Sequence, residues 1–293
     1  MLAQPARTTA AWRATRRVTQ LVHHHFQTTA PAPCTAEPLH IPLPGRTLNA
    51  RVYRPADVND PLPGVIYFHG GGYTLCDLDT HDELCRWLAS LGRATLVSVE
   101  YRFAPEHRFP AQLDDAAEAT AWLTERREEL RFAAGPLSIG GDSAGGFLAA
   151  HTAAQLNAAG SGAIALQLLL YPLMHVDEAA CVAERSRLFR LIGRAAARTI
   201  GGHVLEDGAP AVSLSPHQVA AAPPTLIVSG GLDPIRSEAQ GYAADLAQAG
   251  RPVEHLHFPW LHHGGLSFPG LLRTNLEALV EVGEALGRHL HPA

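Results

Sequence analysis

Short apolar runs recur along the chain, and most of them are rich in β-branched residues or leucine and end at glycine or proline. Such runs are typical of buried strands. They lie at residues 64–68, 94–99, 137–139, 165–171, 225–228 and 253–258. Helical patterns lie between and after them, at about 110–128, 145–159, 236–249 and 272–290. This alternation predicts an α/β fold, in which a mostly parallel central sheet carries helices on both faces.

Three segments depart from the alternation. Residues 48–53 show the polar and apolar alternation of an early antiparallel strand. Residues 1–30 predict one amphipathic helix with arginines on one side, and residues 176–210 contain no clear strand but a basic helical run from Arg185 to Arg198. We interpret residues 1–30 and 176–210 as parts of one cap over the strand ends.

The length of 293 residues suits one large domain, and a hydrophobic content of 46% is ample for its core. We therefore expect a single domain over residues 1–293, whose small helical cap is formed by about 1–40 and about 176–210.

Charge and cysteine usage exclude several classes of protein. A net charge of −5 and a pI near 6.4 give no sign of a nucleic-acid partner, and the apolar runs are too short to cross a membrane. The four cysteines have no C-x-x-C spacing, and no apolar secretion signal follows Arg16-Arg17. We expect a cytoplasmic protein with reduced thiols that binds neither nucleic acid nor membranes.

The candidate chemistry starts at Gly141-Asp142-Ser143-Ala144-Gly145, which lies between the apolar run 137–140 and an alanine-rich helical segment. A serine between glycines at a strand-to-helix turn is the nucleophile-elbow pattern. The turn is tight enough to leave no room for a Cβ atom at Gly141 or Gly145. An ordinary glycine-rich turn is the alternative, so the rest of the chain has to supply a base, an acid and oxyanion donors.

Candidates for the base and the acid follow in the order that this pattern requires, with the acid before the histidine. Asp233 comes just after the apolar run 225–228, and His262 and His263 follow the last predicted strand. A serine hydroxyl becomes a good nucleophile only when a base takes its proton, and the acid orients that base. Either histidine could be the base on this evidence, and Asp233 could instead be a plain loop or helix-capping residue.

Oxyanion donors are predicted at His69-Gly70-Gly71-Gly72-Tyr73, directly after the run 64–68. Three consecutive glycines let backbone N–H groups approach a tetrahedral oxyanion, and the amide of Ala144 would complete the set.

Several separated motifs resemble the hormone-sensitive-lipase-like esterases, the bacterial family IV of the α/β-hydrolase fold. The resemblance covers about residues 45–290. It is carried by residues 69–72, 77–82, 101–107, 141–146, 171–172 and 231–234.

The resemblance implies specific roles for residues of this chain. Ser143 would be the nucleophile, His263 the general base and Asp233 the acid that orients it, because aligning Pro259 with the family's proline selects His263 over His262. The amides of Gly71, Gly72 and Ala144 would form the oxyanion hole. Three further residues would support the site without taking part in the chemistry, namely His69, which would brace the glycine loop, Asp142 and Tyr73. A sheet-edge homodimer is a further expectation from the family.

The chain departs from the family pattern at positions near the site. Phe147 stands where asparagine is usual, Gly265 where an aromatic residue is usual, and Ser237 where a second acidic residue is common. The N-terminal segment and the cap insertion are also short. These departures remove no catalytic group, but they alter the expected pocket.

The prediction from the sequence is a serine carboxylesterase that acts on small, uncharged esters with short or medium acyl chains. The same triad would serve hydrolysis of lactones, amides or carbamates, or acyl transfer to another acceptor. A non-catalytic small-molecule receptor on this fold would lack a triad member. The proposed reaction needs no metal and no organic cofactor, and we expect neither. The run His23-His24-His25 does not suggest a metal site, since adjacent residues would point to different faces of a helix.

Overall fold

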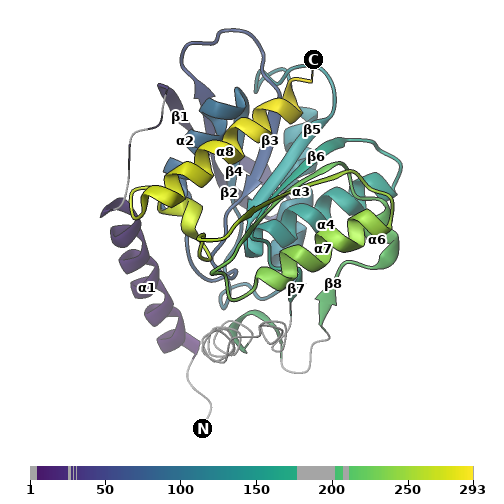
Figure 1. The fold of residues 1–293 in the computed structure, drawn as a ribbon. Helices are drawn as coiled ribbons and strands as arrows, with labels where there is room; N and C mark the ends of the chain where they lie inside the picture. The colour runs from purple at the N-terminus through teal and green to yellow at the C-terminus, as the bar shows by residue number, and fades with distance from the viewer. Residues whose placement is uncertain are drawn as a thin grey trace.

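The computed structural model describes residues 5–25, 28, 30, 32–176, 202–206 and 211–292, and a central eight-stranded sheet runs through it (Figure 1). Its strands, in spatial order, are β1 (Cys34–Leu43), β2 (Arg46–Pro55), β4 (Thr95–Glu100), β3 (Gly64–Phe68), β5 (Leu137–Asp142), β6 (Ile164–Leu170), β9 (Thr225–Gly230) and β10 (Val253–Phe258). The first two strands run antiparallel to their neighbours, and those from β4 to β10 are parallel. The predicted mostly parallel sheet is confirmed.

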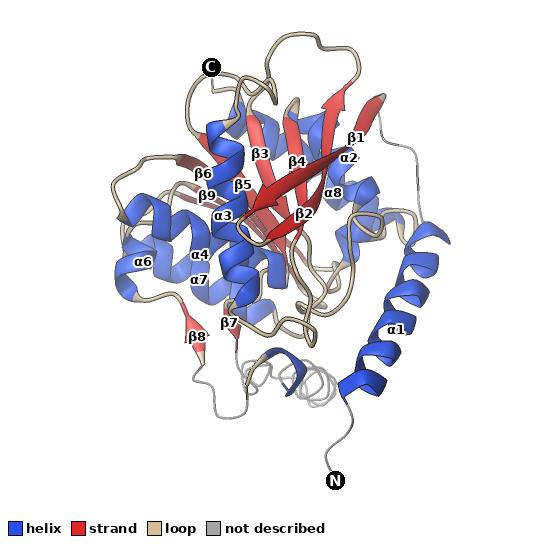
Figure 2. Cartoon of the chain, turned by 180° about the vertical axis from the view of Figure 1, so that it is seen from behind, coloured by secondary structure: helices blue, strands red, loops and turns tan. Residues whose placement is uncertain are grey.

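Helices cover both faces of this sheet (Figures 1 and 2). The helices α2 (Asp82–Gly92) and α8 (Arg273–Leu290) pack on one face. The helices α3 (Ala111–Glu125), α4 (Ala144–Ala158) and α7 (Arg236–Gln248) pack on the other, and α6 (Pro216–Ala220) and the 3₁₀ helix η2 (Gly265–Ser267) are short. Successive residues of a strand serve opposite cores, because Ile227 packs with α4 and α7 whereas Leu226 and Val228 pack with α2 and α8.

The N-terminal segment divides into a helix and a strand. The helix α1 (Pro5–His25) lies beside the body of the molecule near the carboxyl ends of the parallel strands (Figure 1). The helix ends earlier than the sequence predicts, and the part of the expected N-terminal cap from Cys34 to His40 belongs to β1 in the central sheet. A two-residue turn at Pro44-Gly45 joins β1 to β2, so the two strands form a hairpin.

Little of the second predicted cap segment is described. The basic run from Arg185 to Arg198 lies outside the described residues, as does Cys181. Two short strands, β7 (His175–Val176) and β8 (Val212–Ser213), pair at its borders, and Val204 and Leu205 within it are buried.

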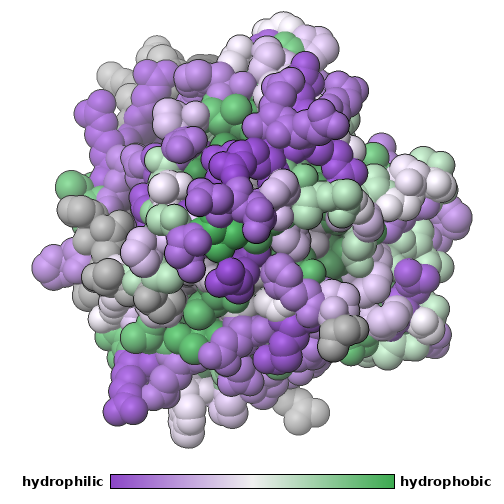
Figure 3. All heavy atoms as spheres, turned by 90° about the horizontal axis from the view of Figure 1, so that it is seen from above, coloured by the Kyte–Doolittle hydropathy of each residue, from purple (hydrophilic) through white to green (hydrophobic). Residues whose placement is uncertain are grey.

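The end of the molecule away from α1 is seen in Figure 3, where hydrophilic residues predominate and smaller hydrophobic areas lie between them. Within the described part of the chain, no helix is both long and apolar enough to cross a membrane.

Candidate active site

The serine elbow lies where β5 meets α4. Ser143 has φ of 50° and ψ of −118°, a strained conformation for a residue with a side chain, and its N–H donates to the carbonyl of Leu170 on β6 at 2.9 Å. A Cβ atom on Gly145 would overlap the backbone carbonyls of Phe68 and His69. The chain can therefore turn this sharply only because glycine occupies that position, and the turn raises Ser143 at the edge of the sheet.

Three strand ends bring Ser143, His263 and Asp233 together. The Nε2 atom of His263 lies 2.8 Å from Ser143 Oγ, and its Nδ1 atom lies 2.9 Å from Asp233 Oδ2. Asp233 is almost fully buried, and its other oxygen accepts a hydrogen bond from the N–H of Ile235 at 2.8 Å. The carboxylate is thus fixed, and it holds the imidazole with one nitrogen directed at the serine.

The neighbouring His262 points elsewhere. Its Nδ1 atom lies 2.9 Å from the carbonyl of His263, and its Nε2 atom lies 3.3 Å from the Asn275 amide. The ring of His263, by contrast, is held edge-on against the ring of Tyr171, with the two centroids 5.2 Å apart. Of the two histidines that the sequence left open, the structure brings His263 to Ser143.

The environment of His263 favours its protonated form. Burial on its own lowers the pKa of this ring, but the charge and the hydrogen bond of Asp233 outweigh it, and Asp142 adds to them, so the pKa is raised above the ordinary value of 6.5. A general base has to be neutral to accept a proton, and His263 becomes neutral only as the pH rises through this raised pKa.

A pH profile tests this shift. We expect kcat/KM for a neutral ester to fall on the acid side with a midpoint above 6.5, because protonated His263 cannot accept the proton of Ser143. The measurement is the initial rate of p-nitrophenyl acetate hydrolysis in buffers of constant ionic strength. A midpoint below 6 would contradict an Asp233-paired base.

The glycine loop follows directly on β3, which pairs with β5, the strand that leads into Ser143. Gly71 and Gly72 follow β3 with φ of 109° and 60°, and within the described residues neither N–H donates to another protein group. Ala144 opens α4, so its amide has no acceptor within the helix. Unpaired N–H donors near a serine hydroxyl can stabilise the negative charge that develops on an oxyanion.

Asp142 connects the glycine loop to the elbow. Its Oδ1 atom accepts hydrogen bonds from the Tyr67 hydroxyl at 2.9 Å and the Gly70 amide at 2.8 Å, and its Oδ2 atom lies 3.1 Å from His81 Nε2. Burial alone would raise the pKa of Asp142, but the His81 ring and the hydrogen bonds from His81 and Tyr67 lower it. The carboxylate therefore stays ionised and ties down the residue that precedes the oxyanion loop.

Sequence reasoning assigned no role to His81. It lies in the stretch 77–82, which was singled out only for its family resemblance, and it meets Asp142 across 61 residues of sequence. The one available signal was the histidine within that stretch.

His69 and Tyr73 border the three glycines in sequence, and both are fully buried. The Nδ1 atom of His69 is 2.7 Å from the carbonyl of Gly70, and its ring stacks on Tyr101 with centroids 4.5 Å apart. Burial, with a smaller contribution from His81, lowers the pKa of His69 to about 4, so the ring is neutral and donates through Nδ1. Tyr73 is fully buried between Tyr101 and Phe109. Both side chains therefore pack among aromatic rings of the core.

Two of the three residues that depart from the family pattern, Phe147 and Gly265, are buried. Phe147 is fully buried on α4, with its ring near those of Phe109 and His151. A Cβ atom on Gly265 would come within 2.7 Å of a Leu261 methyl group, so a larger residue there requires the neighbours to move.

No group of three or more histidine, cysteine or acidic side chains that could hold a metal ion occurs among the described residues. His23, from the histidine run, is buried with its ring 4.0 Å from that of Phe268.

A serine, an imidazole and a carboxylate carried by three strand ends of a parallel sheet, beside unpaired backbone amides, define the α/β class of serine hydrolases. The sequence family described as alpha/beta hydrolase fold matches residues 65–267.

Known proteins agree with this class. The chain is 37% identical to Esterase LipI of Mycobacterium tuberculosis, over 82% of this chain and 78% of the relative. It is 35% identical to an ethyl acetate hydrolase of Pseudomonas putida, over 84% of this chain and 80% of the relative. The solved structure of a hyperthermophilic esterase from Pyrobaculum calidifontis superposes with a TM-score of 0.82 at 32% identity, over 94% of this chain and 90% of that one. The chain belongs to the α/β-hydrolase family, and within it to the hormone-sensitive-lipase-like carboxylesterases.

Proposed function

We propose that the protein hydrolyses small, uncharged carboxylic esters with short or medium acyl chains through Ser143, His263 and Asp233. The observation that carries the proposal is the continuous line from Asp233 Oδ2 through the His263 ring to Ser143 Oγ, with separations of 2.9 and 2.8 Å. Both gaps are hydrogen-bond distances, so a proton can pass from the hydroxyl to the imidazole without rearrangement.

In the first half of the reaction, Ser143 Oγ attacks the ester carbonyl carbon while its proton moves to His263 Nε2. Asp233 stabilises the resulting imidazolium. The amides of Gly71, Gly72 and Ala144 donate to the oxyanion, and each such donor contributes roughly 3–4 kcal/mol. His263 then gives its proton to the departing alcohol oxygen, which leaves an acyl-serine.

In the second half, water attacks the acyl-serine while His263 takes one of its protons. The tetrahedral intermediate uses the same amides, and its collapse returns the proton to Ser143 and releases the carboxylic acid. All protons and charges in these steps are handled by side chains and amides of the chain itself.

The preference for small, neutral esters has two supports. One relative is named an ethyl acetate hydrolase, which is a short-chain activity. The buried carboxylates of Asp142 and Asp233 also lie close enough to His263 to raise its pKa, and the same negative field disfavours anionic substrates.

A labelling experiment and a substrate panel test the proposal together. A fluorophosphonate probe should modify Ser143, identified by mass spectrometry of the peptide that contains it, because the probe reacts with an activated serine. A series of p-nitrophenyl esters from acetate to laurate should then give its highest kcat/KM at a short or medium chain. Absence of labelling, or a maximum at the longest chain, would contradict the respective part of the proposal.

The sheet-edge homodimer and the cytoplasmic location stay predictions. Light scattering on the purified protein measures its molar mass and so tests whether it is a dimer.

A further inference from the structure

Arg16 joins the N-terminal helix to the loop that follows the three glycines. It lies in α1, and its side chain is largely buried, with 14% exposed. Three of its contacts cross to the body of the protein at positions 58 to 90 residues away in sequence. It therefore links two parts of the fold that no local pattern connects.

The guanidinium of Arg16 uses all three nitrogens. Its Nε atom donates to the carbonyl of Thr74 at 2.7 Å, and Nη2 donates to the carbonyl of Ala104 at 2.8 Å. Its two terminal nitrogens also pair with the two oxygens of Glu106, at 3.0 and 2.9 Å, and the group lies 4.9 Å from the centre of the Phe103 ring. A planar, forked group with this many partners holds them in one fixed geometry.

The Thr74 carbonyl belongs to the same turn as the candidate oxyanion donors. The carbonyl of Gly71 accepts from the N–H groups of Thr74 at 3.2 Å and Leu75 at 2.9 Å, so the segment from Gly71 to Leu75 is one compact turn. The Tyr73 carbonyl accepts from the Ala104 amide at 2.9 Å. Arg16 thus holds both sides of this contact, the turn through Thr74 and the neighbouring loop through Ala104.

The charge balance around Arg16 fits a positioning role. Burial would raise the pKa of Glu106, but the hydrogen bonds and charge of Arg16 lower it, so the pair is ionised and neutralises itself. The two carbonyl bonds are then additional contacts that the ion pair does not require.

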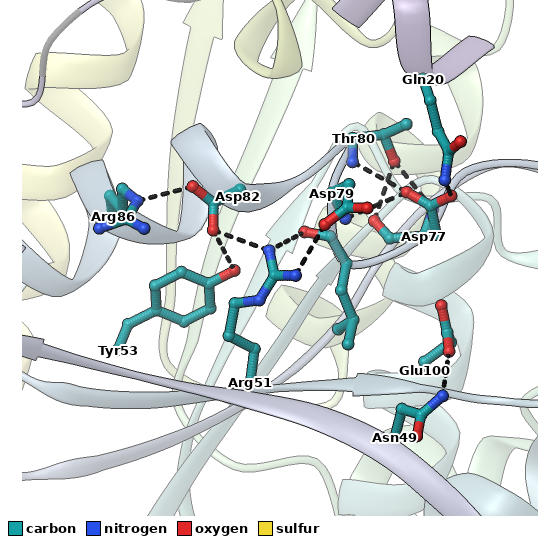
Figure 4. Close-up of polar contacts among 11 residues, drawn as sticks. Gln20, Asn49, Arg51, Tyr53, Asp77, Asp79, Thr80, Asp82, Arg86 and Glu100 are labelled. Carbon is teal, nitrogen blue, oxygen red and sulfur yellow. Dashed lines mark hydrogen bonds and ion pairs between the residues drawn. The ribbon is translucent and has the colours of Figure 1, made fainter. Parts of the chain in front are cut away.

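The helix α1 is attached to the body by polar contacts and by the packing of a few rings, such as that of His23 on Phe268. One turn beyond Arg16, the amide of Gln20 donates to Asp77 at 2.6 Å (Figure 4). None of the described α1 side chains belongs to the hydrophobic cores. Among these contacts, Arg16 supplies a hydrogen bond from α1 to the glycine turn, through the Thr74 carbonyl.

We propose that Arg16 is a positioning residue for the oxyanion hole, which transmits the docking of α1 to the amides of Gly71 and Gly72. This inference rests on the proposed function of the site. Loss of the Thr74 and Ala104 bonds frees the turn and misplaces the donors, whereas binding of the ground-state ester is little affected. The tetrahedral intermediate alone needs the amides in place.

The test compares Arg16→Gln with two matched variants of the intact protein. Glu106→Gln removes the ion pair but leaves Arg16 able to donate to both carbonyls, and Arg17→Gln removes an exposed arginine from the same helix. The readouts are kcat and KM for p-nitrophenyl butyrate, the Ki of a trifluoromethyl ketone that forms a tetrahedral adduct with the serine, and the Tm.

For Arg16→Gln we expect kcat to fall by about 10- to 100-fold and the Ki to rise by a similar factor, with KM changed less than about threefold. Glu106→Gln should change kcat and Ki less than about threefold even where it lowers the Tm, and Arg17→Gln should change neither. Should Arg16→Gln fail to fold, Arg16→Lys replaces it, since one ammonium group can pair with Glu106 but cannot hold two carbonyls as well.

Equal effects of Arg16→Gln and Glu106→Gln on the Ki would overturn the proposal and leave only an ion pair. A lowered Tm with an unchanged Ki would do the same. Failure of the proposed function is distinguishable, because the wild-type protein would then show no serine-dependent esterase activity at all.

Discussion

Replacement of Ser143 by alanine is expected to lower kcat for p-nitrophenyl esters by about 10⁵-fold or more, with little change in the fold. The variant loses the oxygen that forms the acyl intermediate. In the wild type this oxygen lies 2.8 Å from His263 Nε2, so the variant has no hydroxyl group there for His263 to deprotonate. The measurement is the initial rate at saturating ester, together with circular dichroism to compare the folded state.

Two further variants sharpen this expectation. Because the triad acts as one unit, Ser143→Ala combined with His263→Ala should be hardly slower than Ser143→Ala alone. His262→Ala should cost less than about tenfold, since its ring contacts Asn275 and the His263 carbonyl rather than the serine. Substantial activity in Ser143→Ala would require a different nucleophile, and a loss in His262→Ala as large as that in Ser143→Ala would require a different base.

Replacement of Asp233 by asparagine is the second large effect, with an expected loss of about 10⁴-fold in kcat. An asparagine keeps the shape of the side chain but removes the charge that stabilises the imidazolium. The Asp233 carboxylate raises the pKa of His263, so its loss should lower that pKa and move the acid limb of the pH profile to lower pH. Rates measured from pH 5 to 9 test both changes.

The matched control for this variant is Asp245→Asn, on the exposed side of α7, which should leave kcat and the pH profile unchanged. An acid limb that stays in place in Asp233→Asn would show that another group sets the pKa of the base. Retention of more than about a tenth of the activity would show that the carboxylate is not needed to orient it.

Much of the parallel part of the sheet could be predicted from the sequence, because buried parallel strands are continuous apolar runs. The run 253–258, for example, coincides with β10. The strand β1 was missed because Pro38 and Pro42 argue against a strand, yet an edge strand tolerates proline. The helix α2 was also missed, although its apolar residues recur at helical spacing, as at Leu84 and Leu88.

The predictable part of the site was the part that follows strand ends. Ser143, Asp233 and His263 each come just after a strand, so chain order and topology were enough to propose that they meet. The contacts of His81 with Asp142 and of Arg16 with Thr74 span 61 and 58 residues. No periodicity encodes such contacts, since they depend on how loops and a terminal helix pack on the finished fold.

The two prolines of β1 also bear on how this protein can assemble. Pro38 and Pro42 lie four positions apart, an even offset, so both present the same side of the outermost strand, and neither has an N–H to offer. That border of the described sheet is a poor template for another strand, which protects it from unwanted pairing. The opposite border, β10, contains no proline. A second copy that extends the sheet would therefore add beyond β10.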